Sequence, residues 1–504
     1  MIKKWSALML ATMMLTALFA GCIPAAAEEL PYVDLTFYMM DTSLDDMDAF
    51  YEALDELTMR DFNCRVRYKF PGDWIDYESK YRTMLITDDT IDLCYAAQWL
   101  SFPAYAKQDA YMDLTDLLPE YAPGIWAAYP RDMFNGASIG GKIYGIPQNA
   151  RNHHLYMFTY REDLRKKYDL PDMSDLDLDK IELYLKTVLE NEPDFQFAVP
   201  YLYSDPLGMF IPYTKNYDSI DSQGGIGASL VMLVERGTTN IVPYYELPEF
   251  LEFSQRMKRW SDMGFWSKGI LANPDPTEPR DLFNEGVVFA SLSSHLDRAS
   301  DVGETVMKDH PDWEIAVIPY ALWTDAWYNT RSTQDLTVIP YSSKNPERAL
   351  MVLDKMLTDR EYYDLTQYGV LGLNYEFDEN GAVSVANIDQ TNHRFTVNMW
   401  ATRNDDLKYP QFRFWDGRLE FEEKYFPLIT FDPFDGFEAD LTEVQAEYAA
   451  LFTVRQEYGE PIIWGLVDDV EAAIEVYKQK MNEAGMERFQ AEIQRQVEEF
   501  AASR

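Results

Sequence analysis

The sequence predicts an α/β protein with more than one domain, and three observations support this prediction. Strand-like segments alternate with helical segments from about residue 32 onward, a pattern typical of βαβ units that build a mostly parallel sheet. After the N-terminal segment about 480 residues remain, which is enough for two or three domains. Residues 468–500 have the pattern of two long helices broken at Gly485, so we expect a helical C-terminal extension.

Strands are recognised by apolar runs or by alternation with period two, and helices by apolar residues three and four apart. The expected strands are residues 35–39, 64–70, 91–97, 143–147, 198–203, 286–292, 314–319 and 336–340. The expected helices are residues 45–61, 77–86, 158–168, 176–191, 248–263 and 346–358. Ligands of such sheets bind beyond the carboxyl ends of the strands. In the first part of the chain these ends are residues 40–45, 71–76, 98–103 and 148–154.

The N-terminus is typical of an export signal. Two lysines precede an uncharged apolar run at residues 7–20, which is short for a mature membrane span. The run ends in a small residue followed by Cys22, which resembles a bacterial lipobox, although Phe19 occupies a position where Leu is usual. We expect a signal peptide at residues 1–21, with Cys22 lipidated and anchored to the outer face of the cell membrane. An A-x-A-like site at residues 25–27 is the alternative, and cleavage there would release the protein.

The composition is that of a globular protein with a large negative charge. The formal net charge of −41 disfavours binding to nucleic acid, because the chain repels phosphates, and it favours a soluble monomer. Aromatic residues make up 15% of the chain, with 34 Tyr against 28 Phe, and amphipathic Tyr serves recognition surfaces as well as cores. Cys64 and Cys94 lie inside expected strands. A disulfide between them is possible outside the cytoplasm, but two buried free thiols are the favoured reading.

No catalytic or metal-binding pattern in the sequence has the context that its chemistry requires. Residues 136–140 spell G-x-S-x-G, but the nucleophile elbow needs a strand before the serine, and here the strand follows. His153 and His154 are adjacent and cannot share one helical face as in H-E-x-x-H. The acidic residues 432–440 do not have the spacing of an EF-hand loop. We therefore expect no enzyme and no cofactor, and an exported carbohydrate-active hydrolase is kept only as an alternative.

Five segments, taken in their order and spacing, resemble one known family. The segments that carry the resemblance are residues 73–80, 91–94 followed by 98–99, 141–147, 368–375 and 482–485. On these segments the chain is similar over nearly its full length to extracellular solute-binding proteins of family one, the maltose-binding-like components of ABC importers, and within them to the LipO-like lipoprotein subgroup.

The resemblance implies a type II periplasmic-binding-protein-like fold. Each of two lobes would be a mostly parallel sheet flanked by helices, and the chain would cross between them near Asn149, near Arg331, and once more after the helix 346–358. After a tether at residues 22–30, the N-lobe would comprise residues 31–148 plus 331–360, and the C-lobe residues 149–330 plus 361–504. Such a protein would close around a small solute and deliver it to the permease subunits of an importer.

We expect the solute to be an oligosaccharide or a related polyhydroxylated compound, with a peptide or another small solute as the alternative. A sugar needs aromatic rings for its CH face and polar groups that bind pairs of hydroxyls. A scaffolding or adhesion lipoprotein that uses the same fold without transport is a further alternative. The competing interpretations of the candidate side chains are core packing for Trp, helix capping for Asp41, and a solvated hinge for the first crossing. The candidates are Asp41, Trp74, Gln98, Trp99, Asn149, His154, Tyr156, Tyr203, His295, Trp323, Tyr328, Trp400, Arg403 and Asn404.

Overall fold

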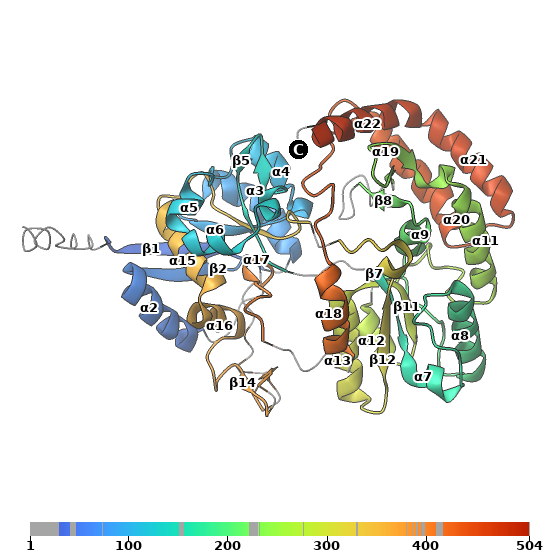
Figure 1. Cartoon of the computed structure of the whole chain (residues 1–504), viewed down its shortest axis with the longest axis horizontal. Helices are drawn as coiled ribbons and strands as arrows, with labels where there is room; N and C mark the ends of the chain where they lie inside the picture. The colour runs from blue at the N-terminus through green and yellow to red at the C-terminus, as the bar shows by residue number, and fades with distance from the viewer. Residues whose placement is uncertain are drawn as a thin grey trace, which may run out of the picture.

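The computed structural model of the chain has two lobes that lie side by side (Figure 1). It describes residues 30–40, 47–72, 74–150, 156–220, 230, 232–275, 277–328, 331–379, 381–385, 387–389, 392–393, 395, 399–409 and 417–502. The expected signal peptide, Cys22 and almost all of the tether lie outside the described residues. Among the described residues, none of the helices combines the length and the apolar character needed to cross a bilayer.

The first lobe is built on a five-stranded sheet with the order β2-β1-β3-β13-β6 among the described residues. β1 pairs in parallel with β2 and β3, whereas β13 is antiparallel to β3 and β6. The strand β13 enters this sheet after the chain has passed through the other lobe, which agrees with the expected type II fold. The strands are β1 (Val33–Tyr38), β2 (Cys64–Lys69), β3 (Leu93–Ala96), β6 (Ile146–Pro147) and β13 (Leu336–Val338).

Helices flank this sheet and bury its apolar residues. Leu35, Phe37 and Val66 of the strands share one core with Leu54 of α2 and Leu353 of α15. The long helices of the lobe are α2 (Asp48–Phe62), α3 (Trp74–Thr87), α15 (Pro346–Thr358) and α16 (Arg360–Tyr368). The shorter elements are η1 (Gln98–Leu100), α4 (Phe102–Lys107), α5 (Leu117–Tyr121), α6 (Pro123–Ala128), η2 (Arg131–Phe134), β4 (Ser138–Ile139), β5 (Lys142–Ile143), β14 (Glu376–Phe377), β15 (Val383–Ser384) and α17 (Met399–Thr402).

The two cysteines of this sheet are free and buried, as favoured from the sequence. Cys64 pairs with Val33 at the start of β1, whereas Cys94 pairs with Tyr38 at its end. The length of β1 therefore separates the two thiols, so no disulfide between them is compatible with this sheet.

The second lobe differs from expectation in the direction of its strands. Its central sheet has the order β11-β7-β12, and β7 (Tyr156–Arg161) is antiparallel to both β11 (Ala290–His295) and β12 (Ile315–Pro319). The expectation of a mostly parallel sheet is wrong for these strands, because β7 leaves the first crossing while β11 and β12 both return toward it. The carboxyl ends of β11 and β12 nevertheless lie beside Tyr156, the first residue after the crossing that the structure describes.

The prediction of a helix over residues 158–168 is also wrong in its first part. Residues 158–161 are the buried end of β7, and the helix α7 begins only at Glu162. A strand that is buried on both faces reads as a continuous apolar run, and periodicity does not distinguish it from a buried helix.

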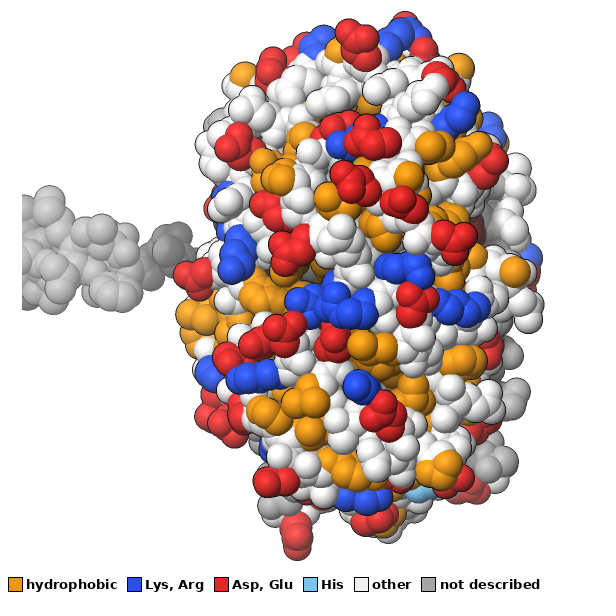
Figure 2. Space-filling view, turned by 90° about the vertical axis from the view of Figure 1, so that its right-hand side faces the viewer, with side chains coloured by type: hydrophobic (Ala, Val, Ile, Leu, Met, Phe, Trp, Pro, Cys, Tyr) orange, Lys and Arg blue, Asp and Glu red, His pale blue; other side chains and the backbone are white. Residues whose placement is uncertain are grey.

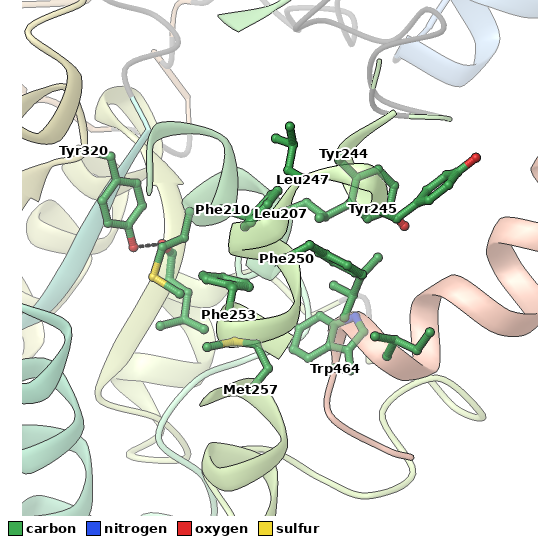
Figure 3. Close-up of a cluster of buried hydrophobic side chains, with 14 of the residues drawn as sticks. Leu207, Phe210, Tyr244, Tyr245, Leu247, Phe250, Phe253, Met257, Tyr320 and Trp464 are labelled. Carbon is green, nitrogen blue, oxygen red and sulfur yellow. Dashed lines mark hydrogen bonds between the residues drawn. The ribbon is translucent and has the colours of Figure 1, made fainter. Parts of the chain in front are cut away.

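The C-terminal helices pack on the second lobe, as expected. The break between them is confirmed at Gly485, whose φ is 99°. Tyr477 of α21 and Phe489 of α22 share a core with Phe158 of β7 and Trp260 of α11, and Figure 3 shows part of this core around Phe250 and Trp464. The elements of this lobe include α7 (Glu162–Lys167), α8 (Leu178–Asn191), α9 (Pro206–Tyr213), β8 (Tyr217–Ser219), β9 (Met232–Glu235), β10 (Ile241–Pro243), η3 (Tyr244–Glu246), α11 (Pro248–Asp262), α12 (Pro279–Asn284), α13 (Leu296–Asp309), α14 (Ala321–Thr324), α18 (Arg418–Tyr425), η4 (Phe426–Leu428), α19 (Gln445–Val454), η5 (Arg455–Gly459), α20 (Glu460–Ile463), α21 (Val470–Glu483) and α22 (Met486–Ala502).

The boundary expected at residue 360 lies elsewhere in the structure. Tyr362, Leu365 and Ala401 belong to the core of the first lobe, so α16 and α17 stay with that lobe, as Figure 1 also shows. Asp359 ends α15 and caps α16, accepting a hydrogen bond from the backbone N–H of Glu361 at 3.0 Å, so the two helices follow one another without an intervening loop. The second lobe resumes with α18, whose Phe421 packs in a cluster of second-lobe residues.

Candidate functional site

Hydrogen bonds join the first crossing, at Asn149, to the residues that follow α17. These contacts bring together three of the predicted residues, Asn149, Arg403 and Asn404. The backbone N–H of Asn149 donates to the backbone carbonyl of Arg403 at 3.1 Å, and its side-chain amide donates to the side-chain oxygen Oδ1 of Asn404 at 2.8 Å. The Asn404 amide in turn donates to the carbonyl of Leu357 at 2.6 Å, and Arg403 forms an ion pair with Asp405 at 2.6 Å. Asn404 is buried and engaged within the protein, so these polar groups fix the hinge.

A second network, which we call the hinge network, surrounds the other crossing. It consists of Gly136, Arg331, Ser332, Asp432 and Asp435. The Nε of Arg331 lies 2.9 Å from Asp432, and both side chains are buried. The backbone N–H of Ser332 donates to Asp435 at 2.9 Å, and its hydroxyl accepts from the N–H of Gly136 at 3.1 Å. Burial raises the pKa of the Asp435 carboxyl to about 6.

The segment that carries these two aspartates contacts both lobes. Phe431 packs against the core of the first lobe, while Phe434 and Phe437 are buried in the core of the second. The sequence showed only an acidic run at this place, considered as a metal loop. A signal was available in the phenylalanines three residues apart, which indicate a buried segment.

At the first-lobe edge, Gln98 and Trp99 follow β3 as predicted. The backbone N–H of Gln98 donates to the carbonyl of Thr333 at 2.7 Å, and its side-chain oxygen accepts from the Thr333 hydroxyl at 3.2 Å. Trp99 is partly buried, with its ring centroid 6.0 Å from that of Tyr95. Tyr95 donates to the buried carboxylate of Asp335. The carboxyl end of β3 is therefore polar, and it is bound directly to the second crossing.

At the second-lobe edge, three further predicted residues come together; we call them the aromatic trio of Tyr156, Tyr203 and His295. Tyr156 and His295 are cross-strand partners at the ends of β7 and β11. The rings of Tyr203 and His295 meet edge to face, with centroids 5.4 Å apart. Each member is partly exposed. Burial raises the pKa of Tyr156 to about 12; its hydroxyl, like tyrosine hydroxyls in general, is protonated at neutral pH and donates hydrogen bonds.

The remaining predicted residues lie apart from the aromatic trio. The indole N–H of Trp323 donates to the carbonyl of Leu176 at 2.8 Å, and its ring is stacked on Tyr320, so it packs within the second lobe. The hydroxyl of Tyr328 donates to Asp218 at 3.2 Å. Trp400 lies on α17 and is 42% exposed.

Three predictions fall on residues whose side chains the structure does not describe. Asp41 and His154 lie outside the described residues, and only the backbone of Trp74, at the start of α3, is described. The serine of the formal G-x-S-x-G pattern, Ser138, lies in the hairpin β4-β5. This position contradicts the nucleophile elbow, which stands between a strand and a helix.

Two lobes joined by crossings, with polar and aromatic residues at the strand ends beside the crossings, are typical of a two-lobed binding protein. The sequence model of the bacterial extracellular solute-binding protein family matches residues 52–384, and the chain belongs to this family. A second model, a domain of unknown function (DUF3502), matches residues 433–502.

Relatives along the whole chain agree with this assignment. The chain is 23% identical over 99% of both sequences to a carbohydrate ABC transporter substrate-binding protein of Streptococcus pneumoniae. The crystal structure of the N-glycan transport solute binding protein NgtS of S. pneumoniae matches with a TM-score of 0.74 and 22% identity, over 93% of this chain and 99% of that one. The alginate-binding protein AlgQ2 matches with a TM-score of 0.61 and 18% identity, over 93% and 98%. These structures confirm the type II fold.

Proposed function

We propose that this protein is the substrate-binding component of an ABC importer, and that it captures an oligosaccharide between its lobes. The observation that carries the proposal is the aromatic trio, which stands at the second-lobe strand ends beside the first crossing. Rings and hydroxyl donors at one edge suit the apolar face and the hydroxyls of a sugar. The relatives support the same class, since NgtS has been crystallised with Man1GlcNAc and Man5GlcNAc.

In this proposal the two lobes contribute different contacts. The aromatic trio binds from the second lobe. Trp99, Trp400 and the side-chain N–H groups of Gln98, whose oxygen is engaged by Thr333, bind from the first. We also assign ligand contacts to Asp41, Trp74 and His154, on the basis of their places after strands or at the crossing. The predicted residues whose polar atoms are engaged within the protein hold the hinge and the second lobe in shape: Asn149, Trp323, Tyr328, Arg403 and Asn404.

The proposed cellular location is based on the N-terminal signal. We propose that Cys22 is lipidated, that residues 22–30 tether the protein to the outer face of the cell membrane, and that it acts as a monomer with the permease subunits. Figure 2 shows the side of the second lobe that lies to the right in Figure 1, where acidic and basic side chains interrupt the hydrophobic ones. A surface of this kind is suited to contact with water, which supports the monomer.

Thermal unfolding against a ligand panel tests the proposal. The panel contains Man5GlcNAc, kestose, an alginate oligosaccharide and a tetrapeptide. A ligand at 100 times its Kd adds roughly 2.7 kcal/mol of stability, which for a chain of this size raises the Tm by about 2–3 °C. Stabilisation by a saccharide is expected. Stabilisation by the peptide alone would refute the oligosaccharide claim.

A pair of variants then tests the position of the site. Trp99→Ala removes a partly buried ring at the first-lobe edge, and we expect it to weaken binding of the stabilising saccharide at least tenfold. Tyr341→Ala removes a ring that is 68% exposed, beyond the opposite end of β13 from the crossing, and we expect unchanged affinity. Equal affinities of the two variants would place the site elsewhere.

A further inference from the structure

A charged cluster in the second lobe stands beside the aromatic trio, and the sequence did not point to it. It begins at Asp205, two residues after Tyr203. Asp205 caps α9, and its Oδ1 accepts a hydrogen bond from the N–H of Leu207 at 2.9 Å. The residue is nevertheless exposed, so the carboxylate is fixed in orientation by the cap and remains accessible to solvent.

The second part of the cluster comes from the C-terminal region. Arg455 opens the π-helix η5, and Glu460 opens the next element, α20. The Nη1 of Arg455 lies 2.8 Å from Glu460, and the two side chains are 7% and 20% exposed. The Nε of Arg455 is buried and has no hydrogen-bond partner among the described residues. Such an unsatisfied donor is costly inside a protein, and π-helical turns are frequent at functional sites.

The charges of Asp205 and of the Arg455–Glu460 pair act on one another. Burial raises the pKa of the Glu460 carboxyl to about 7, the charge of Arg455 lowers it, and the charge of Asp205 raises it. The charge of Asp205 also reaches Tyr156 of the aromatic trio. The geometry agrees on both sides. Tyr201, four residues before Asp205, is stacked on Trp464, whose backbone N–H donates to the carbonyl of Glu460 at 3.0 Å. In α9, the helix that Asp205 caps, a Cβ on Gly208 would lie 3.8 Å from the ring of Tyr156.

An aromatic ring completes the cluster. Tyr201 precedes Asp205 in the same loop, and the charges of Glu460 and Asp205 both act on its hydroxyl. Its ring is stacked on Trp464 with centroids 5.9 Å apart and an interplanar angle of 20°. Trp464 is fully buried in the core that Figure 3 shows, so it holds the partly exposed ring of Tyr201 in position.

We propose that Tyr201, Asp205, Arg455 and Glu460 form a subsite for one residue of a neutral saccharide, and that the C-terminal region thereby takes part directly in ligand recognition. The inference rests on the proposed function. Carboxylates accept hydrogen bonds from neighbouring hydroxyls, and Arg455 donates to a sugar oxygen while its ion pair keeps Glu460 in place. The four side chains carry two acids and one base, so above the pKa of Glu460 a uronate would meet a net negative charge and be disfavoured.

Isothermal titration with Man5GlcNAc and with an alginate oligosaccharide tests the subsite. We expect Glu460→Gln and Asp205→Asn each to weaken binding of Man5GlcNAc, or of the neutral saccharide that stabilises the wild type most, at least tenfold. Both changes keep the size of the side chain, and Asn also caps helices. The matched control is Glu457→Gln, an exposed acid in the same turn η5, for which we expect unchanged affinity.

The outcomes separate the two proposals. If the wild type binds no saccharide, the proposed function fails. If the wild type binds a neutral saccharide and all variants bind it equally well, the subsite is wrong and the cluster is only an internal ion pair. Tyr201→Ala covers the case in which Glu460→Gln does not fold, and we expect it also to lose at least tenfold in affinity. Tighter binding of the alginate oligosaccharide than of every neutral saccharide by the wild type would overturn the preference for neutral sugars.

Discussion

We expect the substitution Asp432→Ala to lower the free energy of unfolding strongly. The hinge network contains a buried ion pair between the second crossing and the segment that contacts both cores. Arg331 is 1% exposed and Asp432 is 9% exposed at the side chain. Asp432→Ala leaves the guanidinium buried without this carboxylate, while its Nη2 still donates to the carbonyl of Ile220 at 2.7 Å. Removing one partner of a buried pair costs about 3–5 kcal/mol. The substitution also removes the acceptor of the Phe434 N–H, at 2.7 Å, so a loss of about 4–6 kcal/mol is expected.

Urea unfolding followed by circular dichroism and tryptophan fluorescence measures this loss. The control is Glu499→Ala, which breaks the exposed pair with Arg495 on α22 and is expected to cost less than about 1 kcal/mol. The double variant Arg331→Met with Asp432→Leu removes both charges, and we expect it to recover most of the stability. A loss for Asp432→Ala no larger than that of the control would refute the role of the pair.

Three further predictions concern the hinge and the first-lobe sheet. For Asp435, a pKa raised from 3.8 to about 6 means that the folded protein binds the proton more tightly than the unfolded chain; its contribution to stability is present below pH 4 and is lost as the pH rises through 6. Urea unfolding at pH 4 and at pH 7 measures this change. From pH 4 to pH 7 the free energy of unfolding of the wild type should fall by up to about 3 kcal/mol more than that of Asp435→Asn, and equal changes in the two proteins would contradict this. Gly436→Ala should lower the Tm by several degrees in a thermal scan, because a Cβ would lie 2.6 Å from the Cα of Gly136 at a φ of 85°; an unchanged Tm would be inconsistent with this close approach. Cys64 and Cys94 should react with a thiol reagent only after unfolding, since both are fully buried, and rapid labelling of the native protein would show that the sheet opens.

The parts of the fold that the sequence predicted well have local causes. The alternation at residues 64–70 matches β2, and the Pro346 helix begins where its proline allows. The strand at residues 158–161 was missed because a strand buried on both faces has no period of its own. The lobe boundary was misplaced because α16 belongs to the first lobe through the packing of Tyr362 and Leu365, and the apolar pattern of a helix does not indicate which core it joins.

The residues of the candidate site likewise divide into those with a local signal in the sequence and those without one. Gln98 and His295 became candidates because each follows an expected strand, whereas Tyr156 became a candidate because it lies in the polar segment of the first crossing. Arg455 and Glu460 were missed because their partner Asp205 is some 250 residues away along the chain, and no local pattern marks such a meeting.

The positions of the two proposed groups of contacts give them different roles in closure. A ligand shifts an equilibrium between open and closed forms only through contacts that differ between the two forms. Contacts made wholly within the second lobe, such as those of Glu460 and Asp205, are available before and after closure, so they contribute affinity to both states. Contacts with Gln98 and Trp99 of the first lobe form only when the lobes approach, and these favour the closed state. In this scheme the second lobe captures the solute. The first lobe, which is bound to the second crossing through Thr333, then contacts the captured solute and favours the closed state.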